Sequence, residues 1–180
     1  MAIRPIFETP DPILRQISKP VETFDAELKT LVADMFDTMY AAPGIGLAAV
    51  QVGVPIRLIV IDLQEPEEED GEPVRDPRVF INPEILWHSD EEVPYTEGCL
   101  SVPEQYAEVM RPERILAKWR DEDGGEHEME IDGLLAVCLQ HEMDHLEGIL
   151  FIDHLSRLKR DMVLKKLAKW RKEQATAQAA

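Results

Sequence analysis

Hydrophobic residues recur with helical spacing in three segments of the chain. The first helix is predicted over residues 25–40, where apolar side chains stand at i, i+3, i+4, i+7 and i+11: Leu28, Leu31, Val32, Met35 and Met39. Thr23 or Asp25 would cap its start, and Pro43-Gly44 would stop it. A second helix is predicted over 132–147, with Gly148 at its end. It contains L-L-A-V-C-L, which is apolar nearly all the way round, so we expect it to pass through the core.

A third helix is predicted over 156–172, and the Ala- and Gln-rich residues 173–180 are expected to fray. Short runs rich in β-branched residues predict strands over 57–63, 79–86, 115–120 and 126–131. The last two flank D-E-D-G-G, a hairpin turn signal at 121–125. The acidic run over 65–73 is interpreted as a solvated hairpin loop. Strands gathered in the middle with helices before and after them predict an α+β fold, with mixed or antiparallel strands around the central helix.

Length and composition are those of one soluble domain, which we place at residues 1–172. The chain has 180 residues and is 44% hydrophobic. It contains no run of 18 apolar residues, so no membrane span is expected. The charged and proline-rich first twenty residues offer no signal peptide, which predicts a cytoplasmic protein. Its two cysteines, Cys99 and Cys138, are not expected to form a disulfide in a reducing compartment.

Charge is distributed unevenly along the chain. The net charge of -17 argues against a generally basic surface for DNA or RNA. Residues 157–173, however, hold eight basic and two acidic residues, a net of +6, against -23 elsewhere. A basic segment on an acidic body is a candidate interaction surface, although a solvated helix that merely completes the fold has the same pattern.

His141-Glu142-Met143-Asp144-His145 is an H-E-x-x-H motif in the predicted central helix. Residues four apart lie one helical turn above each other, so both imidazoles can bind one metal ion. Glu142 would then project beside them and move protons. A solvent-exposed helix would also accept these residues, but this helix is otherwise apolar. Burying them without a ligand would be costly.

A catalytic metal site usually has three protein ligands, so a third is needed. Phe151 stands where the metzincin pattern requires a third His, and Glu173 is a poor candidate because it ends a basic helix. The natural source is Cys99, in the polar segment E-G-C-L-S. Cys138 is a weaker candidate because it lies in an apolar run, where thiols usually just pack.

Three segments together resemble the peptide deformylase family. They are Gly44-Ile45-Gly46-Leu47-Ala48-Ala49-Val50-Gln51, then Glu97-Gly98-Cys99-Leu100-Ser101, then Gln140-His141-Glu142-Met143-Asp144-His145. They match the family's G-x-G-L-A-A-x-Q, E-G-C-L-S and Q-H-E-x-D-H motifs in order and at similar spacing. Without this resemblance, Gly44 and Gly46 indicate only a turn, since they follow a helix and lack the third glycine of a dinucleotide site. Tyr106 stands where some members have Arg.

The resemblance implies hydrolysis of the formyl amide of N-formylmethionyl peptides, with formate as a product. It implies one Fe²⁺ per chain, replaceable by Ni²⁺, Co²⁺ or Zn²⁺, on Cys99, His141 and His145. Glu142 would move the proton, and the Gln51 amide and Leu100 backbone N–H would stabilise the oxyanion. Further implied roles are substrate binding by backbone near Ile45 and Gly46 and by Glu97 and Gly98. A pair of Glu97 with Arg111 would also brace the Cys99 segment.

Helical spacing places Leu134, Val137 and Cys138 on the same face as His141. They predict an apolar wall beside the metal, suited to a methionine side chain, although they would also serve as plain core. A metalloprotease cutting internal peptide bonds and a non-catalytic metal- or ribosome-binding module remain alternatives. The expected partners are nascent peptides and, through the basic last helix, the ribosome, with no DNA or membrane.

Overall fold

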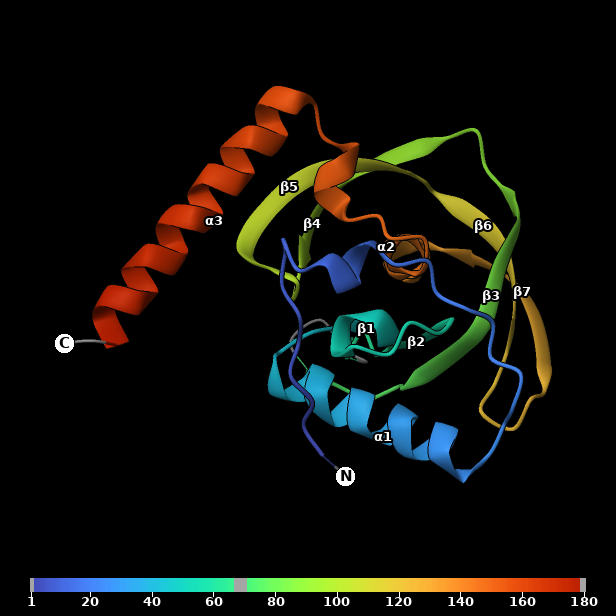
Figure 1. The fold of residues 1–180 in the computed structure, drawn as a ribbon. Coiled ribbons are helices and arrows are strands. Elements are labelled where there is room, and N and C mark those ends of the chain that lie inside the picture. Colours follow the sequence, from blue (N-terminus) through green and yellow to red (C-terminus); the bar gives the residue numbers. More distant parts are fainter. Residues whose placement is uncertain (1, 67–70, 179–180) are drawn as a thin grey trace.

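A computed structural model describes residues 2–66 and 71–178 of the chain. It places the central helix α2 (Gly133–Leu146) in the middle of the molecule, with β-structure curving around it and α1 (Ala26–Ala41) on the opposite side of the short strands (Figure 1). The remaining elements are η1 (Pro12–Arg15), β1 (Gly46–Ala48), η2 (Ala49–Val52), β2 (Leu58–Ile61), β3 (Arg78–His88), β4 (Glu92–Cys99), β5 (Val102–Pro112), β6 (Arg114–Arg120), β7 (Glu126–Asp132), η3 (Phe151–His154) and α3 (Arg157–Gln178).

The described strands form two sheets, and all of their pairings are antiparallel. A five-stranded sheet has the order β1-β2-β3-β6-β7, and β4 and β5 form a separate hairpin. The hairpin between β6 and β7 turns at the predicted D-E-D-G-G, where Gly124 has a φ of +84°. The predicted α+β class is confirmed, with antiparallel rather than mixed strands.

Helix α1 begins where the sequence places it. The Asp25 side chain accepts a hydrogen bond from the Leu28 N–H at 2.9 Å, so Asp25 rather than Thr23 is the N-cap. The five predicted apolar positions are all buried, and they pack against β1 and β2. This layer supports the strand and turn that lead into η2.

Helix α2 is buried over most of its length, as its composition predicts. Ala136, Cys138 and Leu139 join a core cluster with Ile59, Ile61 and Phe80 of the sheet. The helix ends before Gly148, which has a φ of +71°. A Cβ on Gly148 would lie 2.6 Å from the Arg15 carbonyl oxygen, so this residue also lets η1 approach closely.

Helix α3 projects from the body beside the β4–β5 hairpin (Figure 1). Val163 and Leu167 are its buried side chains, and they pack with Val102 and Val109 of β5. The helix continues to Gln178, past the end predicted at Lys172, so the described part of the expected frayed tail is helical. No described helix is both long enough and apolar enough to span a membrane.

Two predictions differ from the structure or fall outside it. Strands β1, β4 and β5 were not predicted. Strand β1 is only three residues long and begins at Gly46, which was interpreted as part of a turn. The polar and exposed residues of β4 and β5 mask the alternation expected of a strand. The acidic run over 65–73 does connect the antiparallel strands β2 and β3, but its residues 67–70 lie outside the described part of the chain.

Candidate active site

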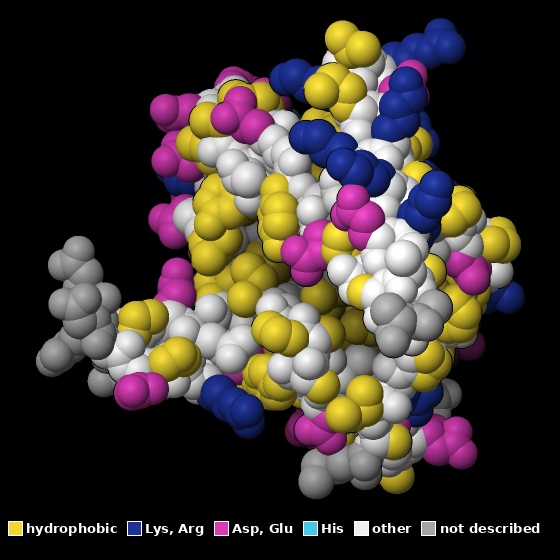
Figure 2. All heavy atoms as spheres, turned by 90° about the vertical axis from the view of Figure 1, so that its left-hand side faces the viewer, with side chains coloured by type: hydrophobic (Ala, Val, Ile, Leu, Met, Phe, Trp, Pro, Cys, Tyr) yellow, Lys and Arg dark blue, Asp and Glu magenta, His cyan; other side chains and the backbone are white. Residues whose placement is uncertain are grey.

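A cavity of about 530 Å³ opens between the α1–β1 connection, the β4–β5 hairpin and α2. Its mouth lies on the face along which α3 runs, where a hollow is lined by hydrophobic side chains (Figure 2). Of the residues predicted to form the site, all but His145 line this cavity: Ile45, Gly46, Gln51, Glu97, Gly98, Cys99, Leu100, Leu134, Val137, Cys138, His141 and Glu142. The fold therefore brings together three sequence segments that are far apart in the chain.

Helix α2 contributes His141 and Glu142 to the lining of this cavity, and His145 lies one helical turn beyond His141. They are 8%, 4% and 0% exposed. The two imidazole rings lie edge to face, with centroids 5.2 Å apart. Burial lowers the pKa of His145, which keeps its imidazole neutral, the form that binds metal ions. The apolar residues Ala136 and Leu139 of the same helix pack in the core, which anchors the helix that carries these side chains.

Cys99 completes a cluster with these histidines from the end of β4, where the register with β5 shifts. One ligand atom from each of Cys99, His141 and His145 lies within 4.8 Å of the other two, and Cys99 Sγ is 3.3 Å from His145 Nε2. Among the described residues this is the group of His, Cys, Asp or Glu side chains able to hold one ion. A sulfur donor with two imidazoles fits a divalent transition metal.

The surroundings of Cys138 make its thiol a poor metal ligand. Burial, together with the nearby carboxylates of Glu142 and Glu97, raises the pKa of the Cys138 thiol well above its usual value. A protonated thiol is a poor ligand. The structure therefore groups Cys99, rather than Cys138, with the two histidines.

Glu97 and Arg111 form a buried ion pair behind the cluster. Arg111 donates to Glu97 from Nε at 2.8 Å and from Nη2 at 2.9 Å, and Glu97 Oε1 lies 2.7 Å from His141 Nδ1. Burial alone would raise the pKa of Glu97, but the hydrogen bonds of Arg111 and His141 outweigh it and lower the pKa to about 2. The carboxylate thus keeps the proton of His141 on Nδ1 and leaves Nε2 free for a ligand bond.

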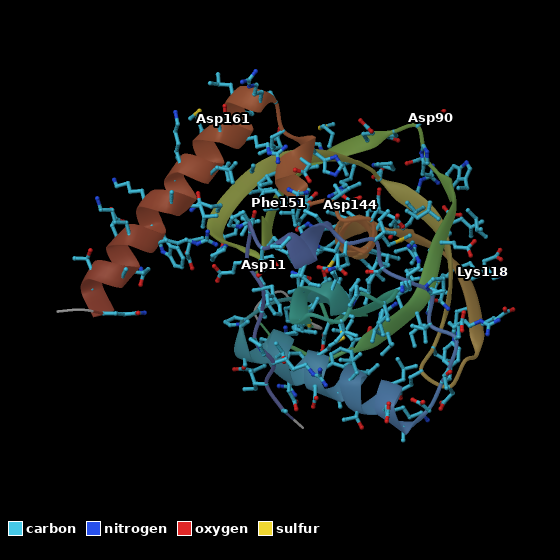
Figure 3. All side chains as sticks on the ribbon, in the orientation of Figure 1. Asp11, Asp90, Lys118, Asp144, Phe151 and Asp161 are labelled. Atoms are coloured by element: carbon cyan, nitrogen blue, oxygen red, sulfur yellow. The ribbon has the colours of Figure 1, made fainter. Side chains whose placement is uncertain are left out.

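Two residues outside the initial candidates extend this support. Asp144 accepts a hydrogen bond from Arg111 Nη1 at 2.7 Å and lies 2.7 Å from His154 Nε2. Phe151, at the position of the missing metzincin histidine, is buried and stacks on the His141 ring at 6.1 Å between centroids. Figure 3 labels both residues, Asp144 on α2 and Phe151 on η3. The sequence could have indicated a supporting role for Asp144, because this residue lies inside the H-E-x-x-H motif.

Glu142 lies beside the cluster and forms no ion pair with any residue that the structure describes. Its Oε2 atom is buried and has no hydrogen-bond partner among the described residues; the same holds for His145 Nδ1. Burial raises the pKa of Glu142 to about 7, although nearby His141 opposes the shift. A carboxyl group with such a pKa can both accept and release a proton near neutral pH.

Gly46 has a steric reason to be glycine. A Cβ there would lie 2.6 Å from Glu142 Oε1 and 3.0 Å from Cys138 Sγ. The β1 backbone can therefore pass close to the reactive carboxyl group only without a side chain. Its neighbour Ile45 is 39% exposed, and the Ile45 carbonyl accepts a hydrogen bond from the Asp62 N–H at 2.9 Å.

The remaining wall of the cavity is apolar. Leu134, Val137 and Cys138 line it from α2, as their spacing predicts. On the opposite side, a Cβ on Gly98 would lie 2.5 Å from the ring of Tyr106, which is 66% exposed at the rim. A long, unbranched apolar side chain could enter between these walls.

The Gln51 side chain reaches the cluster from η2. Its Oε1 accepts a hydrogen bond from the Ala48 N–H at 2.8 Å, and its Nε2 donates to Ser101 Oγ at 3.0 Å and to Cys99 Sγ at 3.6 Å. One amide hydrogen is thus bonded to Ser101, and the other is directed toward Cys99 of the candidate metal centre. Ser101 was not a predicted site residue, although it is the last residue of E-G-C-L-S.

Comparisons with known proteins show which family the chain belongs to. The family model described as polypeptide deformylase matches residues 3–161. The chain is 68% identical over 177 residues to a peptide deformylase of Rhizorhabdus wittichii, covering 98% of this chain and 100% of that protein. The crystal structure of a peptide deformylase from Legionella pneumophila has a TM-score of 0.88 at 50% identity, covering 97% of this chain and 98% of that one.

A second solved structure, peptide deformylase from Ehrlichia chaffeensis in complex with actinonin, has a TM-score of 0.86 at 45% identity. The match covers 94% of this chain and 98% of the Ehrlichia chaffeensis chain. The family-model match extends over most of the chain and includes the segments that line the cavity. The chain therefore belongs to the peptide deformylase family, enzymes that remove the N-formyl group from nascent peptides.

Proposed function

We propose that this chain hydrolyses the formyl amide of N-formylmethionyl peptides with one divalent metal ion, Fe²⁺ in the cell, held by Cys99, His141 and His145. The observation that carries the proposal is the meeting of these three ligands with Glu142 at the inner end of an apolar cavity. The bound ion would supply Lewis acidity, which activates water and polarises the formyl carbonyl. Ni²⁺, Co²⁺ and Zn²⁺ would suit the same mixed sulfur and nitrogen ligands.

Glu142 carries the proton in this reaction. Its carboxylate accepts a proton from the attacking water and then gives it to the amine nitrogen of methionine as the C–N bond breaks. A pKa of about 7 supports both steps, because neither protonation state is strongly disfavoured at neutral pH.

Gln51 and Leu100 stabilise the charge that develops on the formyl oxygen. The Gln51 Nε2–H group and the Leu100 backbone N–H would donate to this oxygen as the carbonyl carbon becomes tetrahedral. The fixed orientation of the Gln51 amide supports this role, since its carbonyl end is already bonded to the Ala48 N–H. Such preorganised donors need no rearrangement during the reaction.

The cavity walls select and align the substrate. Leu134, Val137 and Cys138 would contact the methionine side chain, and backbone at Ile45, Gly46 and Gly98 would run beside the peptide. Glu97 lines the cavity, but its carboxylate is bonded to Arg111 and His141, so it supports the site rather than contacting the peptide.

A simple assay separates this activity from internal peptide-bond cleavage. Anaerobically purified protein should contain one iron per chain and release formate from formyl-Met-Ala-Ser, while leaving casein intact. Casein cleavage without formate release would favour the metalloprotease, and a metal-loaded protein with neither activity would favour a non-catalytic binding module.

We also propose that α3 binds the ribosome in the cytoplasm. Lys165, Lys166 and Lys169 are exposed, while Val163 and Leu167 attach the helix to the domain. Lys and Arg side chains gather along α3 beside the hydrophobic hollow (Figure 2). Contact of this helix with RNA phosphates would thus place the cavity toward emerging chains, while the acidic body is repelled.

A further inference from the structure

The amide group of Gln51 is held at both of its ends. The Ala48 N–H donates to Oε1 at 2.8 Å, and Nε2 donates to Ser101 Oγ at 3.0 Å. Gln51 is 1% exposed and Ser101 is fully buried. One hydrogen bond would leave the amide plane free to swing about its anchor, whereas two opposed bonds fix that plane. The second Nε2 hydrogen is then directed to the side of Cys99 Sγ, which lies 3.6 Å away.

Ser101 accepts the Gln51 hydrogen because its own proton is engaged elsewhere. Its hydroxyl donates to the Phe7 carbonyl oxygen at 2.7 Å. A hydroxyl has one proton, so the lobe of Ser101 Oγ that faces Gln51 is an acceptor. This acceptor requires the nitrogen end of the amide on its side, just as the Ala48 N–H requires the oxygen end on the other. Both contacts select the same orientation.

The N-terminal segment holds this arrangement from outside. The Phe7 N–H donates to the backbone carbonyl of Gln51 at 2.8 Å, and the Thr9 N–H donates to the backbone carbonyl of Ser101 at 2.8 Å. Together with the Ser101 hydroxyl, these bonds join three distant parts of the chain within one buried network. Such networks define a unique geometry when every member is satisfied.

We propose that Ser101 is a positioning residue, which fixes the Gln51 amide so that one N–H group faces the reacting formyl oxygen. The proposal rests on the role of Gln51 in the proposed function. Ser101 is not among the residues that line the cavity, so it would act through Gln51. Because the Ser101 hydroxyl donates to the Phe7 carbonyl oxygen, the position of that oxygen determines where Ser101 Oγ accepts the hydrogen bond from Gln51.

Ser101→Ala removes both hydrogen bonds of the hydroxyl. Losing an oxyanion donor outright costs about 10²–10³-fold in kcat, so Gln51→Ala should show that loss and Ser101→Ala about a 10-fold loss. KM should stay within about twofold in both, because the interaction forms only in the transition state. Ser89→Ala is the matched control: the buried Ser89 hydroxyl also accepts from an N–H, of Arg114, and donates to a carbonyl, of Glu91. It should leave kcat unchanged.

The double variant Gln51→Ala/Ser101→Ala decides how Ser101 acts. If Ser101 works through Gln51, adding Ser101→Ala to Gln51→Ala should change kcat by less than about twofold. An equal loss in both backgrounds, or no loss from Ser101→Ala alone, would overturn the proposal. Ser101→Thr keeps the hydroxyl, so its kcat should lie nearer that of the parent than that of Ser101→Ala; equal losses would also count against it.

The cobalt-loaded protein provides a readout that does not depend on turnover. The hydrogen bond from Gln51 to Cys99 Sγ should influence the sulfur-to-cobalt absorption band. Ser101→Ala should shift this band, and should add no shift in the Gln51→Ala background. A band that Ser101→Ala leaves in place would refute the positioning role. If Gln51→Ala itself keeps full kcat, the role of Gln51 in the proposed function is wrong, and this band alone then tests whether Ser101 orients the amide.

Discussion

Helices α2 and α3 carry charged residues in opposite environments. On α2, His141, Glu142 and His145 are buried, and Glu97 and Arg111 pair beside them with side chains 4% and 6% exposed. On α3, basic side chains point outward, and the Arg171–Glu8 pair is 35% and 41% exposed. Burial makes the charges of Glu97 and Arg111 beside α2 depend on each other, whereas water already solvates the charges on α3. Substitutions on the two helices should therefore differ in both size and kind of effect.

The largest effect is expected at Glu142. Glu142→Gln keeps the shape of the side chain but cannot carry the proton, so kcat should fall about 10²–10⁴-fold while the metal remains bound. Glu147→Gln is a matched control, because Glu147 follows the same helix and its side chain is 48% exposed. Formate release and metal content would be measured together. Near-normal turnover by metal-loaded Glu142→Gln would contradict the assignment.

The two cysteines should differ sharply in metal binding. Cys99→Ser replaces the thiolate by a much poorer ligand, and should weaken metal affinity by more than about 100-fold, beyond the effect usual for supporting residues. Cys138→Ser should keep the metal, because burial holds the Cys138 thiol protonated. Competition with a chelator measures both. Equal metal loss in the two variants would show that the wrong cysteine was assigned.

Substitutions of Arg111 and Arg171 compare the stability contributed by a buried ion pair with that of an exposed one. Arg111→Met leaves the Glu97 charge buried and should lower the free energy of unfolding by about 3–5 kcal/mol. Arg171→Met should cost about 0–1 kcal/mol. The pKa of Glu97 is about 2 instead of 4.5, so its pairing stabilises the fold fully above pH 4.5 and loses this effect as the pH falls toward 2. The penalty of Arg111→Met should shrink over that window, and a penalty independent of pH would argue against this account.

The apolar face of α2 should set side-chain selectivity. Burying the methionine side chain is worth about 1.5–3 kcal/mol, or roughly 10- to 150-fold in kcat/KM over formyl-Ala peptides. Val137→Trp fills the cavity and should erase this preference. Formyl-Ala peptides serve as the internal control, since their smaller side chain depends less on the filled space. Unchanged selectivity would refute the assigned wall.

The smallest effect is expected on α3. Lys165→Glu/Lys166→Glu/Lys169→Glu should leave formate release from free peptides unchanged but weaken co-sedimentation with ribosomes at low salt about 3- to 10-fold. Charge reversal is a cleaner test than deleting α3, because Val163 and Leu167 belong to the core. Lys118→Glu is the control, since Lys118 lies on the side of the molecule away from α3 (Figure 3). If all variants sediment with ribosomes to the same extent, α3 does not bind the ribosome and serves only the fold.

The sequence by itself determined the elements with strong local patterns. Periodic apolar positions located α1, and a nearly all-apolar run that ends before Gly148 located α2. The H-E-x-x-H spacing placed His141 and His145 on one face of that buried helix. The resemblance of three short segments to one family also named the activity class. These features are local, so neighbouring residues suffice to reveal them.

The sequence suggested Cys99 as the third ligand and the resemblance implied a Glu97–Arg111 pair, but only the tertiary structure brings these distant groups together. Strand β4 delivers Cys99 to α2, Arg111 of β5 links Glu97 to Asp144, and the N-terminal segment joins Gln51 to Ser101 through Phe7. It also decided that Asp25 caps α1 and that α3 extends beyond Lys172. Hydrogen bonds between residues tens of positions apart leave no periodic trace in the sequence. Their partners are selected by packing, and burial then sets the charge state of each group.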